Sequence, residues 1–292
     1  MKNKNALILG ATGNVGSEVI KSLLELKSEI QVIAAVRDIE KSREQFDENP
    51  RLDFVRFDFD DQETFETALK GVDVVFVLRP PHISDVNRVF APLIDIISKV
   101  GSGIVFLSVQ GVEKSSIIPH YKIEKLIREA DIPYVFVRPS YFMQNLSTTL
   151  LRDIQEKKKI ILPAGHAKFL WVDTADIGRA SAVLIDEFDR YKNRAFEITG
   201  TEKLNFHEVC QLLTEETGSR IDYTPVNPLR FYAIKSKEGM KSGFILVMIM
   251  LHFLPRFQKE PAVSTSVFDL TGRKPNHLRE FIQREKAIFK VS

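Results

Sequence analysis

Cysteine is nearly absent from this sequence. Cys210 is the only one among 292 residues, so no disulfide can form within the chain and no group of thiolates can hold a zinc ion. No histidine pair of the H-E-x-x-H type is present, and we therefore expect no metal site. A chain without a disulfide framework is typical of a reducing compartment, so we expect a cytoplasmic protein.

An excess of one charge and a long apolar run are also missing. The chain has 41 Lys and Arg against 39 Asp and Glu, which leaves no basic footprint for nucleic acid. The longest apolar run, residues 244–251, reaches Leu254 only across His252, and it falls short of the roughly 20 residues needed to cross a bilayer. We interpret this run as a buried helix or a lid over a pocket, and we expect neither a nucleic-acid nor a membrane partner.

The first half of the chain alternates short apolar runs with helix-length amphipathic stretches. The runs are rich in Val, Ile and Phe, which suits strands buried on both faces of a parallel sheet. About five repeats of strand and helix predict an α/β fold with a Rossmann-type, doubly wound sheet. The expected strands cover residues 6–9, 31–36, 52–57, 72–78, 104–109 and 134–137, and the expected helices cover 15–27, 39–46, 62–70, 86–100 and 120–130.

After about residue 140 this rhythm loosens, and prolines interrupt the chain. We divide the protein into a sheet domain over residues 1–140 and a smaller α+β region over 141–292, partly interleaved with the sheet domain. In the second region we expect helices at 145–156, 174–188, 206–217 and 277–289, and a strand at 194–199.

A glycine loop joins the first expected strand to the first expected helix. Its spacing is G-x-x-G-x-x-G, with glycines at positions 10, 13 and 16. The first permits a tight turn, the second lets the backbone approach a pyrophosphate, and the third lets the helix pack closely on the strand. The free N–H groups of the first helical turn then face the anion. We expect this loop to bind a dinucleotide through Gly10, Thr12, Gly13, Asn14, Val15 and Gly16.

The end of the second expected strand indicates which dinucleotide binds. An NAD site usually places Asp or Glu there, to accept hydrogen bonds from the ribose hydroxyls. This chain ends the strand with Val36 and continues with Arg37. A guanidinium matches a phosphate in charge and in geometry, so we predict that Arg37 binds the 2′-phosphate of NADP. The alternative is a solvated arginine paired with Asp38.

The sequence resembles the NmrA-like group of atypical short-chain dehydrogenases/reductases, which includes type 2 quinone reductases and triphenylmethane reductases. Most of the chain shares the likeness, which is weakest between about residues 220 and 265. The motifs that carry it are G-A-T-G-N-V-G (10–16), A-A-V-R-D (34–38), V-V-F-V-L-R-P-P (74–81), I-V-F-L-S-V-Q-G (104–111), the segment from H-Y-K-I-E-K to Y-F-M-Q-N-L (120–146), W-V-D-T-A-D-I-G (171–178) and T-G-R-K-P-N-H-L-R-E-F (271–281).

The resemblance implies that loops after the fourth, fifth and sixth strands line the cofactor. It also implies that Asp58, after the third strand, lies near the adenine, the alternative being an ordinary acid in a turn. These positions fit the rule that ligands bind at the carboxyl ends of parallel strands. The further cofactor-binding residues implied are Leu78, Arg79, Pro80, Ser108, Val109, Pro139, Ser140, Tyr141 and Phe142.

Tyr121 and Lys125 form a candidate catalytic pair. The spacing i, i+4 places both on one helix face, and many short-chain dehydrogenases use Tyr-x-x-x-Lys with a serine, here Ser108. The lysine favours ionisation of the phenol, which can then exchange a proton with a carbonyl. In the resembling group this tyrosine is commonly absent, so the alternative is a packed or wall-lining Tyr121. His120 is a second candidate to approach the nicotinamide or the substrate, the alternative being a histidine at the start of the helix.

These observations lead to two hypotheses from different classes. The first is an NADPH-dependent reductase that transfers hydride to a small, flat acceptor such as a quinone. The second is a non-catalytic protein that senses NADP(H) and signals to a protein partner, as some members of the resembling group do. A sugar-nucleotide epimerase or dehydratase is a weaker third interpretation, because those enzymes usually separate the serine and tyrosine more widely.

Overall fold

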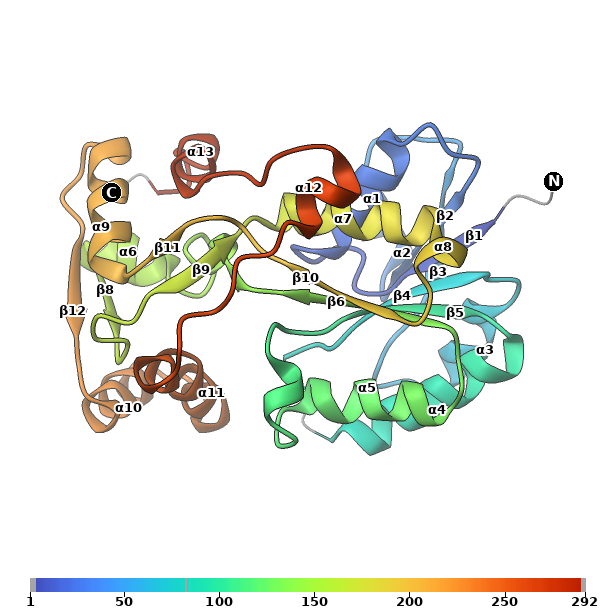
Figure 1. The fold of residues 1–292 in the computed structure, drawn as a ribbon, viewed down its shortest axis with the longest axis horizontal. Helices are drawn as coiled ribbons and strands as arrows, with labels where there is room; N and C mark the ends of the chain where they lie inside the picture. Colours follow the sequence, from blue (N-terminus) through green and yellow to red (C-terminus); the bar gives the residue numbers. More distant parts are fainter. Residues whose placement is uncertain (1–3, 82, 84, 290–292) are drawn as a thin grey trace. The chain divides into compact units, whose positions relative to one another are not determined.

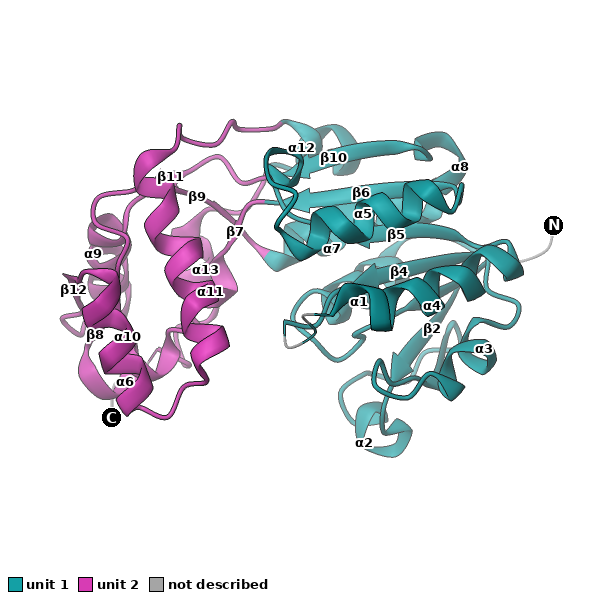
Figure 2. Ribbon diagram, turned by 90° about the horizontal axis from the view of Figure 1, so that it is seen from below, with its two compact units in different colours: residues 1–139, 174–198, 265–274 teal, residues 140–173, 199–264, 275–292 magenta. Residues whose placement is uncertain are grey.

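The computed structural model describes residues 4–81, 83 and 85–289 of the chain. Contacts between residues divide the protein into two units, each assembled from three chain segments. Unit 1 comprises residues 1–139, 174–198 and 265–274, and unit 2 comprises residues 140–173, 199–264 and 275–292 (Figure 2). Each unit has a hydrophobic core of its own.

Unit 1 is built on a seven-stranded sheet in the order β10-β6-β5-β4-β1-β2-β3, and every neighbouring pair is parallel (Figure 1). The chain starts at β1, winds outward through β2 and β3, and then returns to β4 on the other side. The predicted doubly wound α/β sheet is therefore confirmed, with its switch point between β1 and β4. The strands are β1 (Asn5–Ile8), β2 (Gln31–Val36), β3 (Leu52–Arg56), β4 (Val74–Leu78), β5 (Gly103–Leu107), β6 (Tyr134–Pro139) and β10 (Arg194–Ile198).

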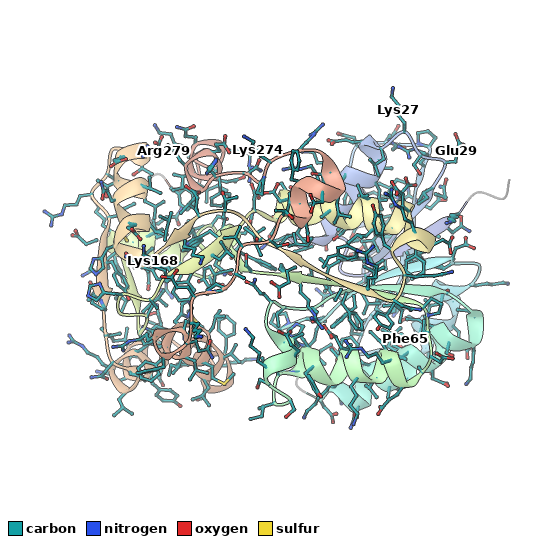
Figure 3. The ribbon with its side chains drawn as sticks, viewed as in Figure 1. Lys27, Glu29, Phe65, Lys168, Lys274 and Arg279 are labelled. Atoms are coloured by element: carbon teal, nitrogen blue, oxygen red, sulfur yellow. The ribbon has the colours of Figure 1, made fainter. Side chains whose placement is uncertain are left out.

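Helices cover both faces of this sheet, with α1 and α7 on one face and α4 and α5 on the other (Figure 1). All five residues of β5 are buried, which explains why the central strands are apolar at successive positions rather than at alternate ones. On α3, Phe65 is fully buried and its ring stacks on Phe57 at 5.0 Å (Figure 3). The helices of unit 1 are α1 (Gly16–Glu25), α2 (Ile39–Arg43), α3 (Glu63–Leu69), α4 (Val86–Val100), α5 (Pro119–Glu129), α7 (Thr174–Asp186), α8 (Phe188–Tyr191), α12 (Ser266–Thr271) and the 3-10 turn η1 (Val112–Lys114).

The helices α1 and α7 cross at very close range. A Cβ atom built on Gly178 of α7 would lie 2.6 Å from the backbone carbonyl of Glu18 on α1. Only a residue without a side chain permits this approach. The glycine that ends the motif at 171–178 therefore fixes the position of the helix that follows the glycine loop.

Unit 2 contains two small sheets with helices around them. One has the strand order β11-β9-β7 and the other pairs β12 with β8. Trp171 is fully buried in its core and donates from Nε1 to the carbonyl of Leu204 at 3.0 Å. The elements are β7 (Tyr141–Phe142), β8 (Lys159–Leu162), β9 (Phe169–Val172), β11 (Lys203–Leu204), β12 (Asp222–Pro225), α6 (Leu151–Lys157), α9 (Phe206–Thr217), α10 (Pro228–Lys237), α11 (Ser242–Phe253), α13 (Leu278–Arg284) and the 3-10 turns η2 (Met143–Asn145) and η3 (Leu254–Phe257).

Two helix predictions in the second half were too long, and five short strands were missed. The helix expected over 145–156 is regular only from Leu151, because the Thr148 hydroxyl donates to the carbonyl of Gln144 at 2.7 Å and holds a turn. The helix expected over 277–289 is regular only over Leu278–Arg284. The missed strands have two to four residues each, too few to show an alternating pattern.

A buried cluster of charges joins α6 to α10 in unit 2. The Lys235 ammonium lies 2.6 Å from one oxygen of Asp153, and Lys157 lies 2.7 Å from the other. Both lysines also bind Glu238, at 3.0 and 2.5 Å. Burial opposes the charge of Glu238, but its hydrogen bonds with Lys157 and Lys235 prevail and hold the pKa of this carboxyl below the usual range. The cluster therefore links two helices that are far apart in sequence.

The apolar run forms α11, so the predicted helix is confirmed. The predicted burial is wrong for one face of it. Ile245, Met248 and His252 are buried, because residues three and four apart share the inner face. Ile249 and Phe253 are half-buried. The remaining large apolar side chains are between 38% and 56% exposed: Phe244, Leu246, Val247, Met250 and Leu251, together with Leu254 just after the helix. Among the described residues, no helix is both long and apolar enough to cross a membrane.

Candidate functional site

The glycine loop follows β1 in a tightly folded form. Gly10 adopts φ +63°, a left-handed conformation that favours glycine. A Cβ atom on Gly10 would also lie 2.9 Å from both δ carbons of Leu78, at the end of β4. The Gly13 N–H donates to the Gly10 carbonyl at 3.0 Å and closes the turn. The loop therefore needs glycine at position 10 for two separate reasons.

Gly16 begins α1 directly against this turn. Its Cβ atom would lie 2.2 Å from the carbonyl oxygen of Gly10, so no larger residue fits without moving the loop. Thr12, Gly13 and Asn14 are exposed, and the N-cap residue Val15 gives no side-chain hydrogen bond to the first turn of the helix. The N-terminus of α1 thus begins without a side-chain cap beside an exposed backbone, an arrangement that fits a phosphate group.

Arg37 follows β2 at the same edge of the sheet and is exposed. Asp38 does not pair with it: the Asp38 carboxylate caps α2 by accepting the N–H of Lys41 at 3.1 Å. Within the described part of the chain, no ion pair or hydrogen bond engages the Arg37 side chain. The guanidinium is therefore available to an anion.

Asp58 lies just after β3 and is half-buried. Its carboxylate accepts the N–H of Asp60 at 3.0 Å, and its own N–H donates to the Thr64 hydroxyl at 3.1 Å. These contacts organise the turn between β3 and α3. A contact with adenine remains a prediction for this residue.

Arg79 and His120 lie together at the carboxyl end of β4. One nitrogen of Arg79, Nη1, donates to the carbonyls of Pro80, Pro81 and Ile83, at 3.1, 3.3 and 2.6 Å. Burial lowers the pKa of Arg79. Burial, and then the charge of Arg79, lower the pKa of His120 to about 3. His120 is therefore neutral at neutral pH and is a poor proton donor.

Ser108 follows β5 directly and belongs to a buried network that the sequence did not reveal. Its hydroxyl donates to Oε1 of Glu124 at 2.7 Å. Arg138 of β6 grips the same carboxylate with Nε at 3.0 Å and Nη2 at 2.8 Å, and Arg128 adds a contact at 3.1 Å. Burial opposes the charge of Arg138, but Glu124 raises the pKa of the guanidinium above its ordinary value. Glu124 is 1% exposed, and it fixes the ends of β5 and β6 to α5.

Glu124 lies three residues after Tyr121 and one before Lys125. These two neighbours are the candidate catalytic pair that the sequence offered on the same helix. The only sequence signal for its role was an acid on the inner face of an amphipathic helix, together with an arginine inside an apolar strand. A buried acid and a buried arginine seldom occur unless they pair.

The structure gives Tyr121 and Lys125 different surroundings from those expected of a catalytic pair. The Lys125 side chain is 63% exposed and its ammonium lies 3.6 Å from Glu129. No hydrogen bond joins Tyr121 to Lys125 or to Ser108, all three of which lie in the described part of the chain. Their catalytic role stays a prediction.

Strand β6 ends at Pro139, and the chain continues into unit 2 at Ser140. The Pro139 carbonyl accepts the N–H of Gln110, which follows Val109 after β5. The hydroxyl of Ser140 is buried and has no hydrogen-bond partner among the described residues. The Tyr141 hydroxyl lies 2.9 Å from Nε2 of His252, and burial raises the pKa of Tyr141. Tyr141 is thus engaged within unit 2, while Phe142 is half-buried.

Comparisons with known proteins agree with these motifs. The chain is 29% identical to the NAD(P)H azoreductase of Xenophilus azovorans, over 97% of this chain and 98% of that protein. It is also 29% identical to the prestalk A differentiation protein A of Dictyostelium discoideum, over 94% and 90% of the two chains. The structure of an NADPH-dependent quinone oxidoreductase from Escherichia coli has the same fold, with a TM-score of 0.82 at 20% identity over 96% and 99% of the chains. The model of the NmrA-like family matches residues 2–275, and the chain therefore belongs to that family.

Proposed function

We propose that this protein binds NADPH in unit 1 and reduces a small, flat acceptor such as a quinone. The observation that carries the proposal is the pair of anion sites at one edge of the sheet. One is the uncapped N-terminus of α1 beside its exposed loop, and the other is the unpaired Arg37. A dinucleotide with a 2′-phosphate carries an anionic group for each.

The cofactor would be held by the residues that these two sites supply. The loop from Gly10 to Gly16 would receive the pyrophosphate at its exposed backbone, which is held in a tight turn that leaves no room for a Cβ atom at Gly10 or Gly16. Arg37 would bind the 2′-phosphate with its guanidinium. Bound NADPH supplies the hydride. The names of two similar proteins, an NAD(P)H azoreductase and an NADPH-dependent quinone oxidoreductase, support a flat, unsaturated acceptor.

Reduction of a quinone to a hydroquinone consumes one hydride and one proton, and the cofactor leaves as NADP⁺. His120 is a poor source of that proton, because its pKa is lowered to about 3. Tyr121 is the remaining candidate acid from the sequence, and its predicted helper Lys125 faces Glu129 instead. We therefore propose that the proton comes chiefly from water, and that Glu124 serves as a positioning residue by holding Ser108.

One pair of measurements tests this proposal. Fluorescence titration with NADPH and NADH should show at least about tenfold tighter binding of NADPH, as one charged hydrogen-bonding partner provides. Mixing the protein with NADPH and a panel of quinones and azo dyes should then give oxidation of the cofactor, followed by its absorbance. Equal affinities overturn the role of Arg37. Tight NADPH binding with no oxidation across the panel overturns the reductase and favours the sensing protein.

A further inference from the structure

Helix α11 exposes an apolar face that the rest of unit 2, as far as it is described, does not cover. Leu246, Val247, Met250 and Leu251 are between 46% and 56% exposed, and Phe257 beyond the helix is 73% exposed. Soluble proteins rarely leave so many neighbouring large apolar side chains in water, and such a patch usually marks a surface that binds a partner.

The buried side chain of His252 fixes the orientation of this helix face in unit 2. The His252 ring lies with Nδ1 2.7 Å from the carbonyl of Met248 and with Nε2 2.9 Å from the Tyr141 hydroxyl. Because a carbonyl can only accept, Nδ1 carries the proton, and Nε2 accepts from Tyr141. Burial lowers the pKa of His252 to about 4, so this neutral form persists at neutral pH. The helix therefore presents its outer face in a defined orientation.

The charges that flank this helix along the chain have one sign. No Asp or Glu occurs between Glu238 and Glu260. Lys241 precedes the helix, while Arg256 and Lys259 follow it, and all three side chains are exposed. The surface is thus apolar in the middle and cationic at both ends, which complements a partner that is apolar inside and anionic outside.

We propose that α11 docks on the surface of an anionic lipid bilayer. Its exposed side chains would enter the boundary between headgroups and acyl chains, while Lys241, Arg256 and Lys259 meet the phosphates. A helix of 12 residues is about 18 Å long, so it lies along the surface rather than across it. The docking goes beyond the proposed reductase function and does not depend on it.

A second copy of this chain is a poorer occupant of the same face. Two antiparallel copies of α11 would bring Lys241 of one near Arg256 of the other. The segment supplies no acid to separate these cations, and like charges in contact oppose association. An anionic surface removes this repulsion, which is why the observations favour lipid.

Sedimentation of the full chain with vesicles tests the proposal. We expect at least about tenfold tighter binding to vesicles that mix phosphatidylserine with phosphatidylcholine than to phosphatidylcholine alone, and weaker binding as salt is added. The double variant L246Q/L251Q should lose binding to both kinds of vesicle. The variant K241Q/R256Q should lose only the preference for phosphatidylserine.

A matched control is Phe268→Gln in unit 1, which changes an apolar side chain of similar exposure, 52%, on α12. It should bind vesicles as the natural chain does. Circular dichroism of each variant verifies folding. Failure to sediment with anionic vesicles at low salt overturns the proposal. So does a dimer, seen by light scattering, that L246Q/L251Q dissociates while vesicle binding is absent.

Discussion

The two units of this protein use buried charge and apolar surface in different ways. In unit 1, helices cover a parallel sheet on both faces, and the buried Glu124 lies where strands end, holding Ser108 and Arg138. In unit 2, buried Asp153 instead ties one helix to another through Lys235. Unit 2 also leaves the outer face of α11 in water.

The difference shows that buried carboxylates have two kinds of role in this protein, and that burial alone does not distinguish them. Both carboxylates are almost fully buried, and both pair with a cation. Only Glu124 is bonded to a residue at the carboxyl ends of the strands, where ligands bind in this kind of sheet. We therefore expect Glu124 to affect function as well as stability, and Asp153 to affect stability alone.

The largest effect should come from removing these two charges. Glu124→Gln and Asp153→Asn each remove a buried carboxylate from a cluster of cations. Arg138 keeps Glu113 and Lys235 keeps Glu238, so each variant should lower the free energy of unfolding by about 3 kcal/mol. Urea denaturation measures this. In the absence of urea, where both variants are folded, only Glu124→Gln should also lower the turnover of NADPH with a quinone.

The exposed pair of Asp95 and Lys99 supplies the control. It lies on the surface of unit 1, with side chains 60% and 71% exposed, so Asp95→Asn should change stability by no more than about 0.5 kcal/mol. Equal losses of turnover in the two buried variants would remove the distinction between the units.

The next largest effect should be on NADPH affinity, and it compares two glycines with different surroundings, Gly16 and Gly243. Gly16→Ala places a Cβ atom 2.2 Å from the Gly10 carbonyl, so the loop must move, and NADPH affinity should fall about 100-fold or more. Gly243→Ala, in α11, meets nothing within 4 Å and should leave affinity unchanged. Calorimetric titration with NADPH measures both. Normal affinity in Gly16→Ala would contradict the proposed phosphate site.

Acid should weaken both units through one buried histidine in each. The pKa values of His120 and His252 are lowered from 6.5 to about 3 and about 4. Above about pH 6.5 both histidines are neutral in the folded and unfolded chains, and neither changes the stability with pH. Below this pH the histidines bind protons in the unfolded chain but stay neutral in the folded chain. Each histidine then costs about 1.4 kcal/mol per pH unit until its folded pKa is reached.

Urea denaturation between pH 7 and pH 5 measures this dependence. His252→Asn should remove the contribution of one proton to the pH dependence of the free energy of unfolding. This contribution amounts to about 2 kcal/mol between about pH 6.5 and pH 5. His120→Asn should do the same independently. The comparison uses slopes, so a general loss of stability in either variant does not affect it. An unchanged slope would show that the histidine titrates normally in the folded protein.

A smaller effect is expected at Arg37, which bears on cofactor choice. Arg37→Gln should weaken NADPH binding about tenfold and leave NADH binding unchanged, because only NADPH carries the 2′-phosphate. Arg43→Gln is the matched control, since Arg43 is also exposed but lies over the ring of Phe54 at 5.0 Å. A parallel loss for both cofactors in Arg37→Gln would mean that Arg37 acts on the loop and not on the phosphate.

The smallest effect should be that of Tyr121→Phe. Ser108 is bonded to Glu124 and Lys125 faces Glu129, so we expect turnover to fall by less than about threefold, well under the 10²–10⁴ typical of a lost acid. Steady-state rates with NADPH and a quinone decide this. A loss of tenfold or more would assign the proton to Tyr121.

The sequence predicted unit 1 far better than unit 2, for physical reasons. Strand 31–36 and helix 86–100 were predicted to the residue, because the strand is apolar between polar turns and the helix has Asp85 before it and Gly101 after it. The strands of unit 2 are too short for a pattern. Ser108 was singled out, but its partner Glu124 was missed, since contacts between distant residues leave little trace in one sequence. The exposed face of α11 was missed because apolarity alone does not distinguish a buried helix from an exposed one.

The three-segment construction of unit 1 has a consequence for how the protein is made. During synthesis, residues 1–139 leave the ribosome before residues 174–198 and 265–274, which supply α7, β10 and α12 to the same unit. Until they emerge, the face of α1 that meets Gly178 lies bare, and β6 is an open sheet edge. The nascent chain must therefore stay unaggregated until residue 274 has been translated, and a fragment ending at residue 139 should need a chaperone.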